Sequence, residues 1–115
     1  MDSLLDFSGK TALITGAASG FGKSLAAELG KRGANLVLAD FNDKGLAQTV
    51  KELEAKGTKL VSLVGDIAEE SHSEDLVALA VKTFGKLDIA VNTTIQFELI
   101  KIQVNIYFIK SEIWE

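Results

Sequence analysis

The chain has 115 residues, a net charge of −4 and no cysteine, so it has room for one small domain but excludes a disulfide framework and a thiolate metal site. It lacks a basic run for nucleic-acid binding, a secretory signal in its N-terminal sequence, and the roughly 18 consecutive apolar residues of a membrane helix. We therefore expect a cytoplasmic protein that binds neither nucleic acid nor membrane.

The first ninety residues alternate predicted strands with predicted helices. Apolar runs at 10–15, 35–40, 59–64 and 87–91 have the length and composition of buried parallel strands. Apolar residues at helical spacing predict three helices between them. The first covers 23–32, the second is capped by Asn42 or Asp43 and ends at Gly57, and the third ends at Gly85. This alternation implies parallel pairing through right-handed crossovers, as in half of a doubly wound α/β sheet.

The composition changes after the fourth predicted strand. All ten glycines lie at or before Gly85, whereas six isoleucines and four of the eight aromatic residues lie within 95–115. Residues 100–107 alternate strictly between apolar and polar, which is typical of a half-buried strand. We expect residues 99–107 to form a strand that pairs either with the edge of the sheet or with another copy of the chain.

A glycine-rich turn, TGAASGFG at 15–22, stands between the first predicted strand and the first predicted helix. Glycine at 16, 20 and 22 would let the backbone approach a pyrophosphate that side chains would otherwise block. The helix that follows would direct unpaired N–H groups and its positive dipole end at the phosphates. A plain turn is the alternative interpretation of these glycines.

Asp40 ends the second predicted strand, 18 residues after Gly22. An acid at this place accepts hydrogen bonds from an adenosine ribose, and the alternative is that it merely begins a loop. A carboxylate about 4 Å from a 2′-phosphate would cost ~1 to ~4 kcal/mol, which is a preference for NAD over NADP of roughly fivefold to a thousandfold. No Lys or Arg lies in the turn and Phe41 follows the acid, so only a swing of Lys44 would offset the repulsion.

Two further features at the start of the third predicted helix carry less weight. The acidic residues there are expected to interact with the positive end of the helix dipole, with metal binding as the alternative. His72, the only histidine, is predicted to be a solvated surface residue. We therefore predict no metal site. The acidic residues are Glu69, Glu70, Glu74 and Asp75.

Taken together, these segments resemble the short-chain dehydrogenase/reductase family over roughly residues 7–92. The turn TGAASGFG matches the family's TGxxxGxG, Gly65-Asp66-Ile67 is similar to the Asp-Val/Ile that borders its adenine, and FGKLDIAVN at 84–92 is similar to the approach to its Asn-Asn-Ala-Gly signature. The resemblance implies a Rossmann-type sheet in the order 3-2-1-4 and NAD as the cofactor. The cofactor residues that it implies are Gly16, Ser19, Gly20, Phe21, Gly22, Asp40, Asp66, Ile67 and Asn92.

The resemblance also implies hydride transfer between NAD and an alcohol or ketone, carried out by a Ser and a Tyr-x-x-x-Lys pair beyond the fourth strand. Here Asn92-Thr93-Thr94-Ile95 stands in place of Asn-Asn-Ala-Gly. The only tyrosine, Tyr107, is followed four positions later by Ser111 instead of Lys. No catalytic residue is therefore assigned, and we expect the 115 residues to bind NAD without turnover.

We accordingly predict a truncated Rossmann-type sheet, with an NAD-binding half-domain over 1–95 and a divergent tail over 96–115. One alternative is a noncatalytic NAD-binding or partner-binding protein that pairs with longer relatives through an exposed sheet edge. Co-purification with such a relative would favour it. Another is an aberrant truncated product without a function of its own, which insolubility and absence of NAD binding would favour.

Overall fold

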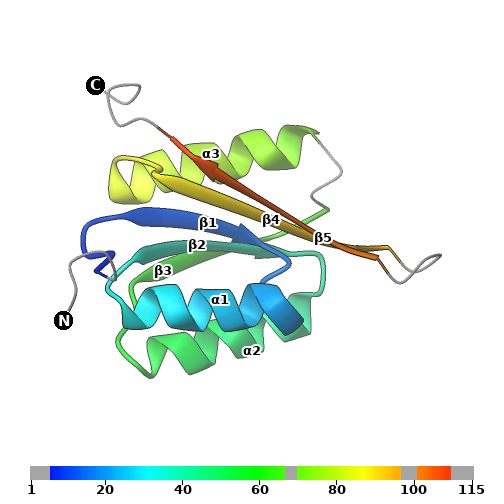
Figure 1. Cartoon of the computed structure of the whole chain (residues 1–115), viewed down its shortest axis with the longest axis horizontal. Coiled ribbons are helices and arrows are strands. Elements are labelled where there is room, and N and C mark those ends of the chain that lie inside the picture. The colour runs from blue at the N-terminus through cyan, green and yellow to red at the C-terminus, as the bar shows by residue number, and fades with distance from the viewer. Residues whose placement is uncertain (1–5, 67–69, 97–100, 110–115) are drawn as a thin grey trace.

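The computed structural model describes residues 6–66, 70–96 and 101–109. Its strands form one five-stranded sheet in the order β3-β2-β1-β4-β5 (Figure 1). The first four pair in parallel, and the fifth runs antiparallel to the fourth. The predicted α/β class and the order 3-2-1-4 are confirmed. The elements are β1 (Thr11–Thr15), α1 (Gly20–Lys31), β2 (Asn35–Asp40), α2 (Asp43–Glu54), β3 (Leu60–Val64), α3 (Glu70–Phe84), β4 (Ile89–Gln96) and β5 (Lys101–Phe108).

The sheet is covered on both faces by helices. Figure 1 shows α1 and α2 on one face and α3 on the other. Leu36 and Leu38 of β2 belong to the core beneath α1 and α2, whereas Val37 and Ala39 belong to the core beneath α3. Burial on both faces explains why this strand is a continuous apolar run without alternation.

The start of α2 follows a local signal in the sequence, whereas the start of α1 does not. The side chain of Asn42 accepts a hydrogen bond of 3.1 Å from the N–H of Gly45, so Asn42 caps α2. By contrast, α1 begins at Gly20, three residues before the predicted start at residue 23. Glycine has low helix propensity, which hid this start in the sequence, and tertiary packing overrides that weak local preference. The second half of the glycine-rich turn is therefore the first turn of a helix.

The last two strands extend past the rest of the sheet. β1 pairs only with Ile89–Val91 of β4, whereas β5 pairs with β4 along Ile89–Gln96. The remainder of β4 continues with β5 as a two-stranded ribbon beyond the end of β1 (Figure 1). β5 lies within the tail that was expected to form a strand, and it pairs with the sheet edge. Residues 99 and 100 of that expected strand are outside the described residues.

Candidate functional site

Most of the predicted cofactor residues meet at one edge of the sheet. β1 runs into the glycine-rich turn, β2 ends at Asp40, and Asp66 follows the end of β3. Because these strands are parallel, their carboxyl ends lie together, which is where open α/β sheets bind ligands. Asn92 of β4 joins them, since its Oδ1 accepts a hydrogen bond of 2.7 Å from the hydroxyl of Thr15. Ile67 lies outside the described residues.

Two glycines of the turn are required by close contacts. Gly16 has φ +68°, and a Cβ there would overlap the hydroxyl of Thr93. A Cβ at Gly22 would overlap the carbonyl oxygen of Gly16, because α1 begins directly against the turn. Gly20 also has a positive φ, of +58°, but the space beside its Cα is open. The turn is thus closed towards the protein and open at Gly20.

The first turn of α1 has no side-chain cap. Ser19 stands at the cap position in an extended conformation, and its side chain makes no capping hydrogen bond. No acidic residue lies in this first turn. The first N–H groups of a helix have no partner within the helix and carry a partial positive charge. The N-terminus of α1 therefore has the chemistry of an anion site, with exposed Ser19, Gly20 and Phe21 around it.

The carboxylate of Asp40 is held in one orientation beside this turn. Its Oδ2 accepts a hydrogen bond of 2.9 Å from the N–H of Ala18. Its Oδ1 accepts one of 3.0 Å from the N–H of Asn42. Asp40 is half-buried, so the bonded carboxylate still reaches solvent. The arrangement joins the acid at the end of β2 directly to the glycine-rich turn.

Thr93 is a residue of this site that the sequence analysis did not select. Its N–H donates a hydrogen bond of 3.2 Å to the Thr15 hydroxyl oxygen, and its own hydroxyl donates one of 2.9 Å to the Thr15 carbonyl. These bonds tie β4 to the end of β1 and place the Thr93 side chain against Gly16. Its position in the sequence could have indicated this role, because Thr93 directly follows Asn92, where the family that this chain resembles has a second Asn.

The prediction for His72 is wrong. Its side chain is only 6% exposed, and its ring lies where a Cβ on Gly65 would be. His72 precedes Leu76 and Ala80 by four and eight residues, so it lies on the buried face of α3. Among the described residues, its Nε2 has no hydrogen-bond partner. The polar neighbours of His72 in the sequence concealed this helical spacing.

The alternative of metal binding by the acidic residues receives no positive support from the described part of the chain. Glu74 and Asp75 are exposed there, while Glu69 lies outside it. Within the described ranges no three His, Cys, Asp or Glu side chains come together as metal ligands would. None of the described helices combines the length and the apolar character needed to cross a membrane.

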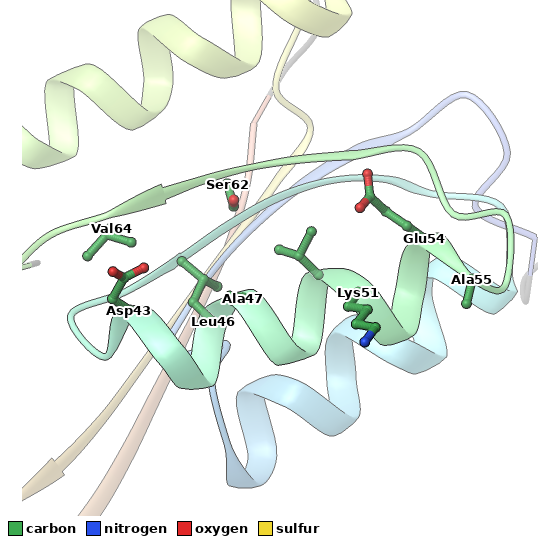
Figure 2. A pocket seen from close by; sticks show the side chains of 9 residues that line it. Asp43, Leu46, Ala47, Lys51, Glu54, Ala55, Ser62 and Val64 are labelled. Carbon is green, nitrogen blue, oxygen red and sulfur yellow. The ribbon is translucent and has the colours of Figure 1, made fainter.

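A hollow of about 600 Å³ lies elsewhere, between α2 and the edge strand β3 (Figure 2). Leu46, Val50 and Val64 provide apolar lining, and Asp43, Lys51 and Glu54 also line it. None of the predicted cofactor residues that the structure describes lines this hollow. The candidate site is therefore the carboxyl edge of the sheet, where the motif residues meet, and not this groove.

Comparison with known proteins indicates the family that this chain is similar to. The model of the short chain dehydrogenase family matches residues 10–114. The chain is 46% identical over 83 residues to a diacetyl reductase [(S)-acetoin forming] of Staphylococcus epidermidis, covering 72% of this chain and 32% of that protein. It is 40% identical over 85 residues to an L-rhamnose 1-dehydrogenase (NAD(P)(+)) of Sphingomonas sp., covering 73% of this chain and 34% of that protein.

Most of this chain also matches part of a solved structure. It is a short chain dehydrogenase/reductase from Burkholderia phymatum in complex with NAD, with a TM-score of 0.70 and 38% identity. The match covers 72% of this chain and 30% of that one. The chain thus spans about a third of the length of the curated relatives it matches.

Proposed function

Because this chain belongs to the short-chain dehydrogenase family, we propose that it binds NAD at the carboxyl edge of its sheet. The observation that carries the proposal is the uncapped first turn of α1 beside Asp40. The glycine-rich turn before α1 holds the Asp40 carboxylate through the N–H of Ala18. A helix N-terminus next to a ribose-binding acid is the arrangement that dinucleotide sites use. The cofactor residues are Gly16, Ser19, Gly20, Phe21, Gly22, Asp40, Asp66, Ile67 and Asn92.

Each group of residues has a separate task in this proposal. The pyrophosphate lies at the first turn of α1 and accepts hydrogen bonds from its N–H groups. Asp40 accepts hydrogen bonds from the adenosine ribose, and Asp66 and Ile67 border the adenine. Asn92, anchored to Thr15, lies towards the nicotinamide end of the cofactor.

The cofactor is NAD and not NADP in this proposal. The Asp40 carboxylate is fixed by two backbone N–H groups, so it cannot turn away from a 2′-phosphate without losing both hydrogen bonds. Lys44 is exposed on α2 and is the cation that would have to approach to offset the repulsion. Among the relatives, the Sphingomonas enzyme is named for NAD(P)(+) and the Burkholderia structure contains NAD.

For the longer proteins of this family, the resemblance implies hydride transfer between NAD and an alcohol or ketone. In this proposal the 115 residues hold only the nucleotide-binding part of such an enzyme. Tyr107 lies on β5 with 57% of its surface exposed, and no Lys follows it at the fourth position. A tuned proton donor needs such a partner beside the reacting carbon. We expect no dehydrogenase turnover from the 115-residue chain.

Calorimetric titration of the 115-residue chain tests the proposal. We expect ADP-ribose and NAD to bind with affinities within about tenfold of each other, a difference below about 1.4 kcal/mol, because the contacts to the adenosine and pyrophosphate dominate. The Gly20→Trp variant should lose both ligands, since its side chain fills the open space at the helix N-terminus.

Two results would contradict the proposal in different ways. Absence of ADP-ribose binding would show that the chain has no nucleotide site at this edge of the sheet. A rate of NAD-dependent alcohol oxidation above that of Gly20→Trp would instead show that the chain carries a catalytic group outside the family pattern.

A second role, association through the sheet edge, is favoured by exposed apolar side chains on β5. Ile106, Tyr107 and Phe108 are 51%, 57% and 80% exposed. Open strand edges and exposed apolar surface promote pairing between chains. We expect light scattering on a size-exclusion column to show a dimer that the double variant Ile106→Lys with Phe108→Lys converts to a monomer. A wild-type chain that stays monomeric at every concentration would rule this role out.

A further inference from the structure

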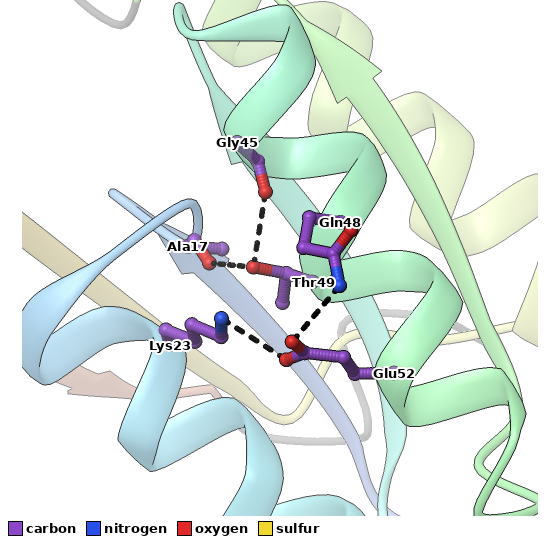
Figure 3. A network of polar contacts seen from close by, with 6 residues as sticks. All are labelled: Ala17, Lys23, Gly45, Gln48, Thr49 and Glu52. Carbon is purple, nitrogen blue, oxygen red and sulfur yellow. Dashed lines mark hydrogen bonds and ion pairs between the residues drawn. The ribbon is translucent and has the colours of Figure 1, made fainter.

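Thr49 of α2 is a buried polar residue outside the predicted site, in contact with the glycine-rich turn. Its side chain is fully buried. Its hydroxyl lies 3.0 Å from the carbonyl oxygen of Ala17 and 3.2 Å from that of Gly45, so it shares its one hydrogen between them (Figure 3). The Gly45 contact is the ordinary back-bond of a helical Thr, whereas the Ala17 contact joins α2 to the turn.

The Ala17 carbonyl belongs to a peptide unit that is held at both ends. Its oxygen accepts from Thr49, and the N–H of the same unit, which is that of Ala18, donates to Oδ2 of Asp40. A peptide unit is planar, so its C=O and N–H rotate together. Thr49 and Asp40 therefore bind opposite ends of one rigid, planar peptide unit.

This peptide unit directly precedes, in the sequence, the N–H groups that would face a pyrophosphate. Ser19 follows Ala18 and is the cap residue of α1. The N–H of Ala17 is also bonded, at 3.1 Å, to the carbonyl of Ala39 in β2. Three hydrogen bonds therefore hold the Ala17–Ala18 part of the turn, and the one from Thr49 comes from a side chain outside the proposed cofactor residues.

A separate contact joins α1 and α2 at the surface of the protein. Lys23 and Glu52 form an ion pair of 3.0 Å, and Gln48 donates a hydrogen bond of 3.1 Å to Glu52 (Figure 3). The hydrogen bonds from Gln48 and then Lys23 hold the pKa of the Glu52 carboxyl below its ordinary value of 4.5. Both side chains of the pair are exposed by more than a third, so water and salt screen the attraction.

From these contacts we infer that Thr49 is a positioning residue for the nucleotide site: its hydroxyl fixes the Ala17–Ala18 peptide and thereby the direction of the turn and of the Asp40 carboxylate. The inference rests on the proposed NAD-binding function and deepens it. Without the hydroxyl, the Ala17 carbonyl is buried without its side-chain partner and the peptide can tilt. The binding N–H groups then lose their preorganised direction.

The test compares Thr49→Val, which keeps the shape and removes the hydroxyl, with Thr49→Ser, which keeps the hydroxyl. We expect Thr49→Val to bind ADP-ribose about tenfold more weakly than the wild type, as for loss of one hydrogen bond, and Thr49→Ser to stay within about twofold. Glu52→Gln removes the surface ion pair between the same two helices and should leave the affinity unchanged. The unfolding midpoint of every variant is measured alongside the affinity.

The outcomes separate positioning from simple stability. A lower midpoint for Thr49→Val with wild-type affinity would overturn the inference, since the hydroxyl would then only stabilise the fold. If Thr49→Val fails to fold, Thr49→Ala is compared with Thr49→Ser: weaker binding by Ala supports the inference, and equal binding overturns it. Failure of the wild-type chain to bind ADP-ribose would contradict the proposed NAD-binding function itself.

Discussion

Replacing Gly22 with alanine is expected to destabilise the fold and to abolish ADP-ribose binding. The new Cβ would overlap the carbonyl oxygen of Gly16, and it would lie 2.8 Å from the carbonyl carbon of that residue and 3.1 Å from the oxygen of Thr15. All three are backbone atoms, so the clash is relieved only by moving α1 away from the turn. Overpacking of this kind costs about 1–3 kcal/mol. Each kcal/mol lowers the unfolding midpoint of a domain of 60–100 residues by about 4–8 °C.

The loss of binding should exceed what instability explains. Gly57→Ala is the matched control, because Gly57 has φ +85°, no atom lies within 4 Å of its Cβ position, and it is far from the turn in the loop after α2. Alanine at this positive φ should lower the free energy of unfolding by about 1–2 kcal/mol, and with it the unfolding midpoint. The ADP-ribose affinity of Gly57→Ala should stay that of the wild type. Wild-type midpoint and affinity in Gly22→Ala would show that α1 does not pack against the turn as described.

Replacing Asp40 with asparagine is expected to narrow the preference for NAD over NADP. The change removes the charge that would face a 2′-phosphate, so we expect the ratio of affinities for ADP-ribose and 2′-phospho-ADP-ribose to fall by roughly fivefold to a thousandfold. It also replaces one of the two oxygens that accept the N–H groups of Ala18 and Asn42. That loss should lower the free energy of unfolding by about 1 kcal/mol, measured by urea titration.

Asp43→Asn makes the same change of charge three residues further along the chain, at the exposed start of α2. It should leave the ratio of affinities unchanged, because Asp43 does not hold the turn. An equal effect from both variants would mean that the preference follows net charge and not the position of Asp40. Equal binding of both nucleotides by the wild-type chain would show that the acid has no part in selection.

Much of the fold could be predicted because its signals are local. The run Asn35–Asp40 matched β2 to the residue, since a strand covered on both faces must be apolar along its whole length. Asn42 was one of two predicted caps for α2, because a short polar side chain before a helix bonds its first N–H groups. The glycines of the turn could be predicted as well, since Gly16 and Gly22 have no room for a Cβ and Gly20 has a φ of +58°.

Other features could not be predicted because they depend on how the helices and strands pack against one another. His72 looked solvated among polar neighbours, yet the packing of α3 on the sheet buries it against Gly65. The direction of β5 was open as well, since alternation of residues predicts a strand but not the strand that it joins.

For the candidate site, the sequence alone determined which residue types stand at the ends of the strands: the glycines after β1, Asp40 after β2 and Asn92 in β4. Only the tertiary structure decided how they are joined. Thr15 and Asn92 are 77 positions apart and meet because β1 and β4 pair in parallel. Thr49 reaches Ala17 across 32 positions because α1 and α2 pack on the same face. Backbone conformation and burial leave a pattern within a few residues, whereas a hydrogen bond between distant segments exists only once the sheet has brought them together.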